Sequence, residues 1–171
     1  GLLHLLLARA GGAGKILATD VNEYRLRMAR KLGADAVMHA RGNVKKRLAE
    51  INEGRLADVV IVCTGALPAF REALECVDRG GTILFFATTK PGIKLPVPVD
   101  RFWRNEVTLV TSYANSPGDA QDAIELIKSG RVPVRKLVTH RLTLKEAPRG
   151  FKLVAEAKKS VKVIIEPHKA L

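Results

Sequence analysis

Asp20 is the residue whose type and position point most directly to chemistry. It follows a short apolar run, KILAT at residues 15–19, and lies nineteen residues after Gly1. In nucleotide-binding sheets, an acid at the end of the second strand accepts hydrogen bonds from the adenosine ribose hydroxyls and repels a 2′-phosphate, which favours NAD over NADP. An Asp that begins the turn into the next helix explains the position equally well. Arg25 could lie against the adenine or ribose, or on a solvated helix face.

The residues before Asp20 match the later part of a dinucleotide-binding motif. Residues 1–20 (GLLHLLLARAGGAGKILATD) are typical of an apolar helix, a glycine-rich turn and a short strand that ends in an acid. In proteins that bind a dinucleotide, these parts normally follow another strand and two more glycines. We therefore expect a chain that begins within its own binding motif.

Along the chain, β-rich segments alternate with helix-like segments, and these elements must position the candidate residues. Strands are expected at residues 15–19, 36–39, 58–63, 82–87, 107–112, 136–140 and 161–166. Helices are expected at residues 2–10, 22–32, 43–51, 68–77, 120–129 and 149–158. Several of the strands are unbroken apolar runs, as parallel strands covered on both faces require. The pattern predicts an α/β fold with a doubly wound, mostly parallel Rossmann sheet.

Local signals refine three of these segments. Asn22 is expected to cap the helix at residues 22–32, which ends at Gly33. Its expected core positions are Leu26, Ala29 and Leu32. Residues 2–10 are apolar nearly all round, as in a buried crossover helix. Residues 88–103 contain three prolines and are predicted to form an extended surface connection.

Composition bounds the class of protein. With 171 residues, 47% hydrophobic and 27% charged, the chain fits one globular domain and not a disordered segment. Residues 1–8, the longest uncharged apolar run, are too short to span a membrane. The net charge is +12, but Lys and Arg are spread along the chain with few aromatic residues between them, so nucleic-acid binding is not expected. Cys63 and Cys76 lie in apolar surroundings, which favours buried free thiols in a reducing cytoplasm.

Residues 1–34 (GLLHLLLARAGGAGKILATDVNEYRLRMARKLGA) resemble the coenzyme-binding domain of the zinc-dependent medium-chain alcohol dehydrogenases, with the sorbitol-type polyol dehydrogenases as nearest relatives. The resemblance extends over all 171 residues. It includes CTG at residues 63–65, GGTILFFA at 80–87, KLVTHRLTLKEA at 136–147 and SVKVII at 160–165. It implies one NAD-binding Rossmann domain at residues 1–171, incomplete at its N-terminus, from an NAD-dependent oxidoreductase of alcohols or polyols.

The resemblance also implies a set of cofactor-binding residues. Gly1 matches the third glycine of the G-x-G-x-x-G turn, where small size lets the helix pack on the sheet. Asp20 and Arg25 match the residues at the adenosine ribose, and Lys162 falls where the family often has an Arg at the pyrophosphate. The remaining matches follow later strands, with Thr64 and Gly65 passing close to the cofactor, Phe86 and Thr88 beside the nicotinamide, and Ser112 and Ala114 at its carboxamide.

The parts of the family that do not match this sequence matter as much. The domain that carries the catalytic and structural zinc ligands is not represented. The four histidines, His4, His39, His140 and His168, lack metal-ligand spacing, and no catalytic residue is assigned. We therefore expect cofactor binding, but no dehydrogenase activity from this chain alone. The unmatched first strand belongs between residues 15–19 and 58–63, so the sheet must close up, take a strand from another copy or belong to a longer protein.

Two other functions remain open. Residues 107–112 match the edge strand through which relatives pair across a two-fold axis, so the chain could be a non-catalytic dimerising module. A Rossmann-like methyltransferase would also place a ribose-binding acid after its second strand. The closing residues 136–140 and 160–165 favour the dehydrogenase, because methyltransferase sheets usually end in an antiparallel hairpin.

Overall fold

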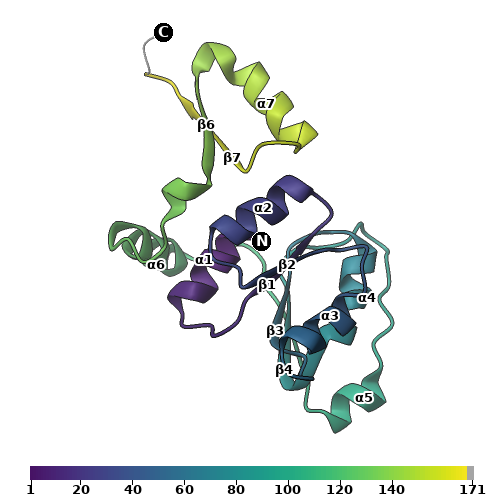
Figure 1. Ribbon diagram of the computed structural model, residues 1–171. Coiled ribbons are helices and arrows are strands. Elements are labelled where there is room, and N and C mark those ends of the chain that lie inside the picture. The colour runs from purple at the N-terminus through teal and green to yellow at the C-terminus, as the bar shows by residue number, and fades with distance from the viewer. Residues whose placement is uncertain (169–171) are drawn as a thin grey trace. The chain divides into compact units, whose positions relative to one another are not determined.

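The computed structural model describes residues 1–168, which form two compact units (Figure 1). The first unit contains Gly1 and Ala40–Ser116. The second contains Leu2–His39 and the chain from Pro117 onward. Each unit has its own hydrophobic core.

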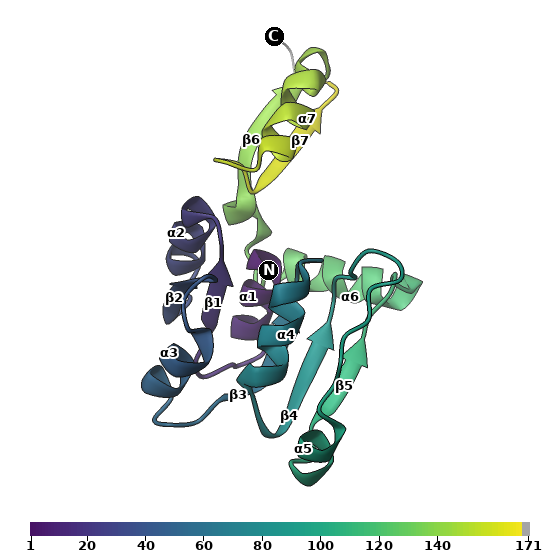
Figure 2. The same ribbon diagram turned by 90° about the vertical axis from the view of Figure 1, so that its right-hand side faces the viewer.

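The first unit is built on a parallel sheet with the strand order β3-β4-β5. The strands are β3 (Ala57–Val62), β4 (Val77–Phe85) and β5 (Thr108–Thr111), and β4 and β5 run side by side in Figure 2. The helix α4 (Leu67–Cys76) packs on β3 and β4, and α3 (Val44–Ile51) packs on α4. Ile83 is fully buried in the core between sheet and helix, where the rings of Phe70 and Phe85 stack 5.0 Å apart.

The prediction of an extended connection over residues 88–103 is wrong at its end. A short helix, α5 (Val99–Arg104), follows the last of the three prolines, and its Phe102 is buried in the core of this unit. Arg101 donates one hydrogen bond to the Glu75 carboxylate, forms an ion pair with its other oxygen and donates to the Leu74 carbonyl, and Lys45 donates to the same carboxylate. The helix is thus stabilised by tertiary contacts that local propensity does not report.

The second unit contains two pairs of parallel strands. β1 (Leu17–Asp20) pairs with β2 (Ala36–His39), and α2 (Glu23–Lys31) packs on both. β6 (Val138–Thr143) pairs with β7 (Lys162–Glu166), and α7 (Ala147–Glu156) lies along them (Figure 1). The unit also contains α1 (Leu2–Ala10), α6 (Pro117–Lys128) and the short 3₁₀ helices η1 (Val134–Leu137) and η2 (Leu144–Glu146).

The helices of the second unit test two of the local predictions. Asn22 caps α2, and Leu26, Ala29 and Leu32 are all buried, as predicted. The prediction that residues 2–10 form a buried helix is only half correct. The helix α1 buries Leu5 and Leu6, but Leu3 and Leu7 are 50% and 46% exposed. The apolar character of a segment predicts the helix but does not decide how many of its faces are covered.

The helix α7 depends on a glycine for its contact with β6 and β7. A Cβ atom on Gly150 would lie 3.2 Å from Ile165 Cδ1 and 3.3 Å from Leu142 Cδ1, closer than most real Cβ contacts. The helix ends two residues before the predicted residue 158, because Ala157 adopts the left-handed conformation (φ 51°, ψ 19°). Left-handed backbone ends a helix and is strained for a residue with a Cβ atom.

The strand pairs in the described residues are parallel, which confirms the predicted α/β class with parallel strands. They form three sheets and not one, and within residues 1–168 β1 pairs only with β2, while β3 pairs only with β4. Within the same residues, no helix combines the length and the apolar character that crossing a membrane requires.

The two cysteines differ in burial, and we expect them to differ in reactivity. Neither forms a disulfide; Cys76 is buried as predicted, but Cys63 is only half-buried. Burial, together with the Glu72 carboxylate, raises the pKa of the Cys76 thiol to about 11, which leaves about one thiolate in a thousand at pH 8. Iodoacetamide at pH 8 should therefore label native protein at Cys63, with Cys76 labelled only after denaturation. Equal rates at the two positions, read by peptide mass spectrometry, would contradict this.

Candidate functional site

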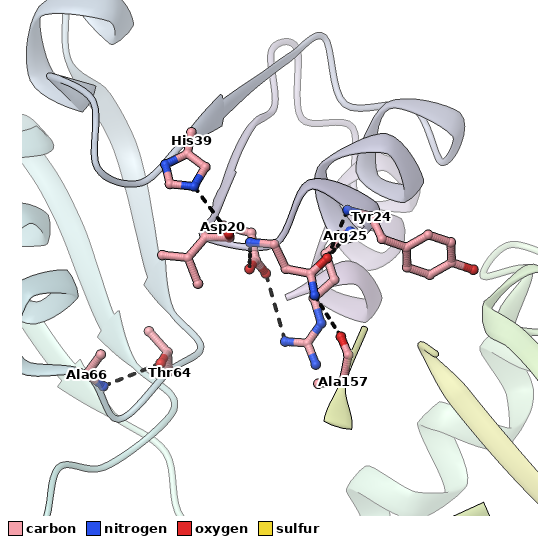
Figure 3. Close-up of polar contacts among 9 residues, drawn as sticks. Asp20, Tyr24, Arg25, His39, Thr64, Ala66 and Ala157 are labelled. Atoms are coloured by element: carbon pink, nitrogen blue, oxygen red, sulfur yellow. Dashed lines mark hydrogen bonds and ion pairs between the residues drawn. The ribbon is translucent and has the colours of Figure 1, made fainter. Parts of the chain in front are cut away.

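Asp20 lies at the carboxyl end of β1, where the predicted site requires it. It is the last residue of the strand, is aligned with His39 of the parallel strand β2, and its side chain is 29% exposed. Its Oδ1 accepts a hydrogen bond from the backbone N–H of Asn22 at 2.9 Å (Figure 3). Asp20 therefore begins the turn into α2 and also presents a carboxylate at a sheet edge, so its two explanations are compatible.

Arg25 lies beside this carboxylate. Its Nη1 atom is 3.9 Å from Asp20 Oδ2, an ion-pair distance too long for a hydrogen bond (Figure 3). Arg25 belongs to the first turn of α2, and its backbone N–H donates to Asn22 Oδ1 at 3.2 Å. The Arg25 side chain is 43% exposed, so solvent screens the pair and leaves the guanidinium able to turn toward a ligand.

In the first unit, six of the predicted residues follow three neighbouring strand ends. The last residues of β3, β4 and β5 are aligned across the sheet, Val62 with Phe85 and Phe85 with Thr111. Because the strands are parallel, the residues that follow them lie at one carboxyl edge. These residues are Thr64 and Gly65 after β3, Phe86 and Thr88 after β4, and Ser112 and Ala114 after β5. All six are exposed.

Two of these segments touch at Gly65. A Cβ atom on Gly65 would lie 2.6 Å from the carbonyl oxygen of Thr88, a distance that real Cβ atoms essentially never show. The neighbouring Thr64 hydroxyl accepts a weak hydrogen bond from the Ala66 N–H at 3.4 Å, which shapes the turn into α4 (Figure 3). Gly65 is therefore required by the close approach of the segment after β4.

The other residues at this edge offer an aromatic face and strained backbone. Phe86 is half-exposed, and its N–H continues the sheet by donating to the Val62 carbonyl. Ala114 has a left-handed backbone with φ 60°, which is uncommon for a residue other than glycine and concentrates at ligand sites. An exposed ring and exposed backbone suit a flat heterocycle with a carboxamide.

Two predicted residues are placed differently from the rest. Lys162 is exposed and begins β7, so it does not lie at a carboxyl edge. A Cβ atom on Gly1 would meet Cys63 Cβ at 3.9 Å, an ordinary contact, so the described residues do not themselves demand a glycine there. Their assignment to the cofactor remains a prediction from the resemblance.

The histidines and acidic residues were also compared with the geometry that a metal ion requires. Within residues 1–168, no group of three or more His, Cys, Asp and Glu side chains is arranged to hold a metal ion. His4 is partly buried in α1, and burial, helped by the N-terminal charge, lowers its pKa. The His39 ring lies 3.2 Å from the Val21 carbonyl oxygen (Figure 3).

Sequence reasoning missed one contact at the site. The Nδ2 group of Asn22 donates to the carbonyl oxygen of Ala157 at 2.7 Å, across 135 residues of sequence. The cap role of Asn22 was readable from the residues that follow it. Nothing in the sequence indicated its contact with Ala157, because a small residue near a helix end is common and does not predict a partner.

The parallel strands, the covering helices and the polar residues at the strand ends define a Rossmann-like fold. The zinc-binding dehydrogenase family model matches residues 1–129. The chain belongs to this zinc-binding dehydrogenase family.

Individual relatives agree with this membership. The chain is 33% identical over 170 residues to the probable D-xylulose reductase A of Aspergillus terreus, covering 96% of this chain and 47% of the relative. The solved alcohol dehydrogenase of Thermus sp. ATN1 is 30% identical with a TM-score of 0.83, covering 95% of this chain and 46% of that one. A zinc-binding dehydrogenase of Sinorhizobium meliloti, solved with NADP bound, shares the fold at 24% identity and a TM-score of 0.85, covering 97% and 49%. The chain thus spans about half the length of the curated relatives it matches.

Proposed function

We propose that this chain binds NAD(H) and positions its nicotinamide for hydride transfer in a dehydrogenase of alcohols or polyols. The observation that carries the proposal is the position of Asp20, a partly exposed carboxylate at the carboxyl end of β1 in a parallel pair. Two adjacent ribose hydroxyls can donate to one carboxylate, which recognises an unphosphorylated ribose and repels a 2′-phosphate.

The predicted residues of the first unit, taken by themselves, have features that fit a nicotinamide. Gly65 lets the segment after β4 come close to the turn after β3, so predicted residues of both segments lie together beyond the strand ends. Phe86 offers an exposed ring, and the segment at Ser112 and Ala114 offers backbone groups to a carboxamide. The nicotinamide supplies the hydride chemistry when bound, and these residues would bind and orient it.

The described residues offer no cluster of His, Cys, Asp and Glu side chains that fits a zinc ion. We therefore assign no zinc ligand to residues 1–168 and derive no step through the metal. The substrate pocket is likewise not assigned to these residues. We expect the protein to work in the cytoplasm, where reducing conditions keep its two cysteines as thiols.

Calorimetric titration with three ligands tests the proposal. We expect NAD to bind, NADP to bind more weakly, and S-adenosylmethionine not to bind. Saturable binding of S-adenosylmethionine without NAD binding would instead support the methyltransferase alternative. Failure to bind any of the three would leave the dimerising module as the better interpretation.

A second role, self-association, is favoured by the edge of the three-stranded sheet. β5 is the last strand in the order β3-β4-β5, and all four of its residues are exposed, with Leu109 and Val110 each 38% exposed. Tyr113, just after the strand, is fully exposed. An apolar edge strand of this kind is a template for pairing with a second copy.

Substituting Val110→Lys should therefore shift a dimer toward monomer by at least tenfold in dissociation constant, because the charge would be desolvated at the paired edge. Sedimentation equilibrium measures the change. Val99→Lys, at an exposed position on α5, is the matched control and should leave association unchanged. A Val110→Lys protein that associates as tightly as the wild type would exclude this edge as the interface.

A further inference from the structure

We propose that Asn22 is a positioning residue for the dinucleotide site: it fixes the Asp20 carboxylate and ties it to the loop that leads to Lys162. This inference rests on the proposed function and extends it to a residue that would not itself touch the cofactor. Asn22 is half-buried, between β1 and α2.

Four hydrogen bonds meet at this residue. The side-chain Oδ1 accepts from the N–H groups of Tyr24 at 2.8 Å and Arg25 at 3.2 Å, while Nδ2 donates to the Ala157 carbonyl at 2.7 Å (Figure 3). The backbone N–H donates to Asp20 Oδ1 at 2.9 Å. Only one orientation of the amide satisfies two donors on one side and a carbonyl on the other, so the side chain is fully specified.

The first consequence concerns Asp20. The N–H that holds its Oδ1 belongs to the backbone of Asn22, which has extended dihedrals (φ −105°, ψ 112°). The three side-chain hydrogen bonds of Asn22 hold that backbone in place. A carboxylate with one oxygen fixed by an oriented N–H presents its second oxygen in a defined direction, and this pre-organises it for two ribose hydroxyls.

The second consequence concerns the loop between α7 and β7. Ala157, whose carbonyl Asn22 binds, lies five residues before Lys162 in the same unit. The rest of the loop is fixed by Ser160 Oγ, which donates to the Leu153 carbonyl at 2.7 Å, and by the Val161 N–H, which donates to Thr139 Oγ1 at 3.1 Å. Asn22 therefore connects the ribose carboxylate to the segment that carries the predicted pyrophosphate residue.

The variant Asn22→Ser separates this role from helix capping. A serine hydroxyl is a good cap acceptor but is too short to reach the Ala157 carbonyl. Asn43→Ser is the matched control, because Asn43 caps α3 by accepting from the Lys46 N–H at 2.9 Å and belongs to the other unit. We expect Asn22→Ser to raise the Kd for NAD about tenfold and to reduce the preference for NAD over NADP.

Amide hydrogen exchange provides a readout that a simple loss of stability would not produce. In ligand-free protein, Asn22→Ser should raise exchange at residues 158–162 about tenfold while α2 stays protected. Asn43→Ser should leave both this exchange and the Kd for NAD unchanged.

The outcomes distinguish this inference from the proposed function. If the wild type binds NAD and Asp20→Ala weakens binding, but Asn22→Ser changes neither affinity nor exchange, the positioning role is overturned and the proposed function stands. If the wild type does not bind NAD, the proposed function is overturned and the positioning role with it.

Discussion

Replacing Asp20 with Ala is expected to weaken NAD binding about 100-fold. Hydrogen bonds to a charged acceptor contribute about 1.5–3 kcal/mol each, and the side chain faces two ribose hydroxyls in the proposed complex. A loss of about 3 kcal/mol of binding free energy corresponds to an increase of about 100-fold in Kd. Isothermal titration of the purified variant with NAD measures the change directly.

Affinity for NADP should respond differently to the same substitution. Removing the carboxylate also removes the repulsion of a 2′-phosphate, so the ratio of the two Kd values should move toward NADP. Asp58→Ala is a suitable control, because Asp58 lies near the amino end of β3, where it is exposed and pairs with Arg55. An Asp20→Ala protein with unchanged affinity and unchanged NAD preference would remove the basis of the proposed function.

The substitution Gly65→Ala is expected to weaken NAD binding at least tenfold and to destabilise the first unit by about 1–3 kcal/mol, as overpacking does. The new Cβ would lie 2.6 Å from the Thr88 carbonyl oxygen, which is backbone and cannot turn aside as a flexible side chain would. The turn after β3 or the segment after β4 must therefore move, which displaces Gly65 or Thr88, both of them predicted cofactor residues. Titration with NAD and thermal denaturation measure the two effects.

Gly14→Ala is the matched control for this substitution. Gly14 also lies in a turn, but a Cβ atom there would meet nothing within 4 Å. It should leave both affinity and thermal midpoint nearly unchanged. Wild-type affinity in Gly65→Ala would show that the close approach to Thr88 has no part in binding.

The elements that the sequence predicted well are those with strong local signals. The helix Leu2–Ala10 and the strand Ala36–His39 have the predicted bounds, because an apolar run and its flanking turn residues mark both ends. The cap at Asn22 followed from the same kind of signal. The predicted residues after β3, β4 and β5 lie at one edge of the sheet, because each of them follows the carboxyl end of a parallel strand.

The features that escaped prediction depend on contacts distant in sequence. The helix α5 is stabilised because Phe102 is buried in a core and Arg101 pairs with Glu75. The three nearby prolines, which indicated an extended segment, predict neither contact. The start of β4 at Val77, ahead of the predicted residue 82, involves an irregular pairing with β3 around Ala57. The hydrogen bond from Asn22 to Ala157 joins two segments that are distant in sequence, and the residue types of neither segment indicate this contact.

The carboxylate that holds α5 also makes the attachment of this helix sensitive to acid. Hydrogen bonds from Arg101 first, and from Lys45, keep the pKa of Glu75 below its ordinary value. The stabilisation is therefore complete at neutral pH and disappears as the pH falls through that lowered pKa. Protonation would leave two cations facing a neutral acid, so acidification below the ordinary pKa range of a glutamate should weaken the polar attachment of this short helix to α4, while the apolar contacts of Phe102 persist.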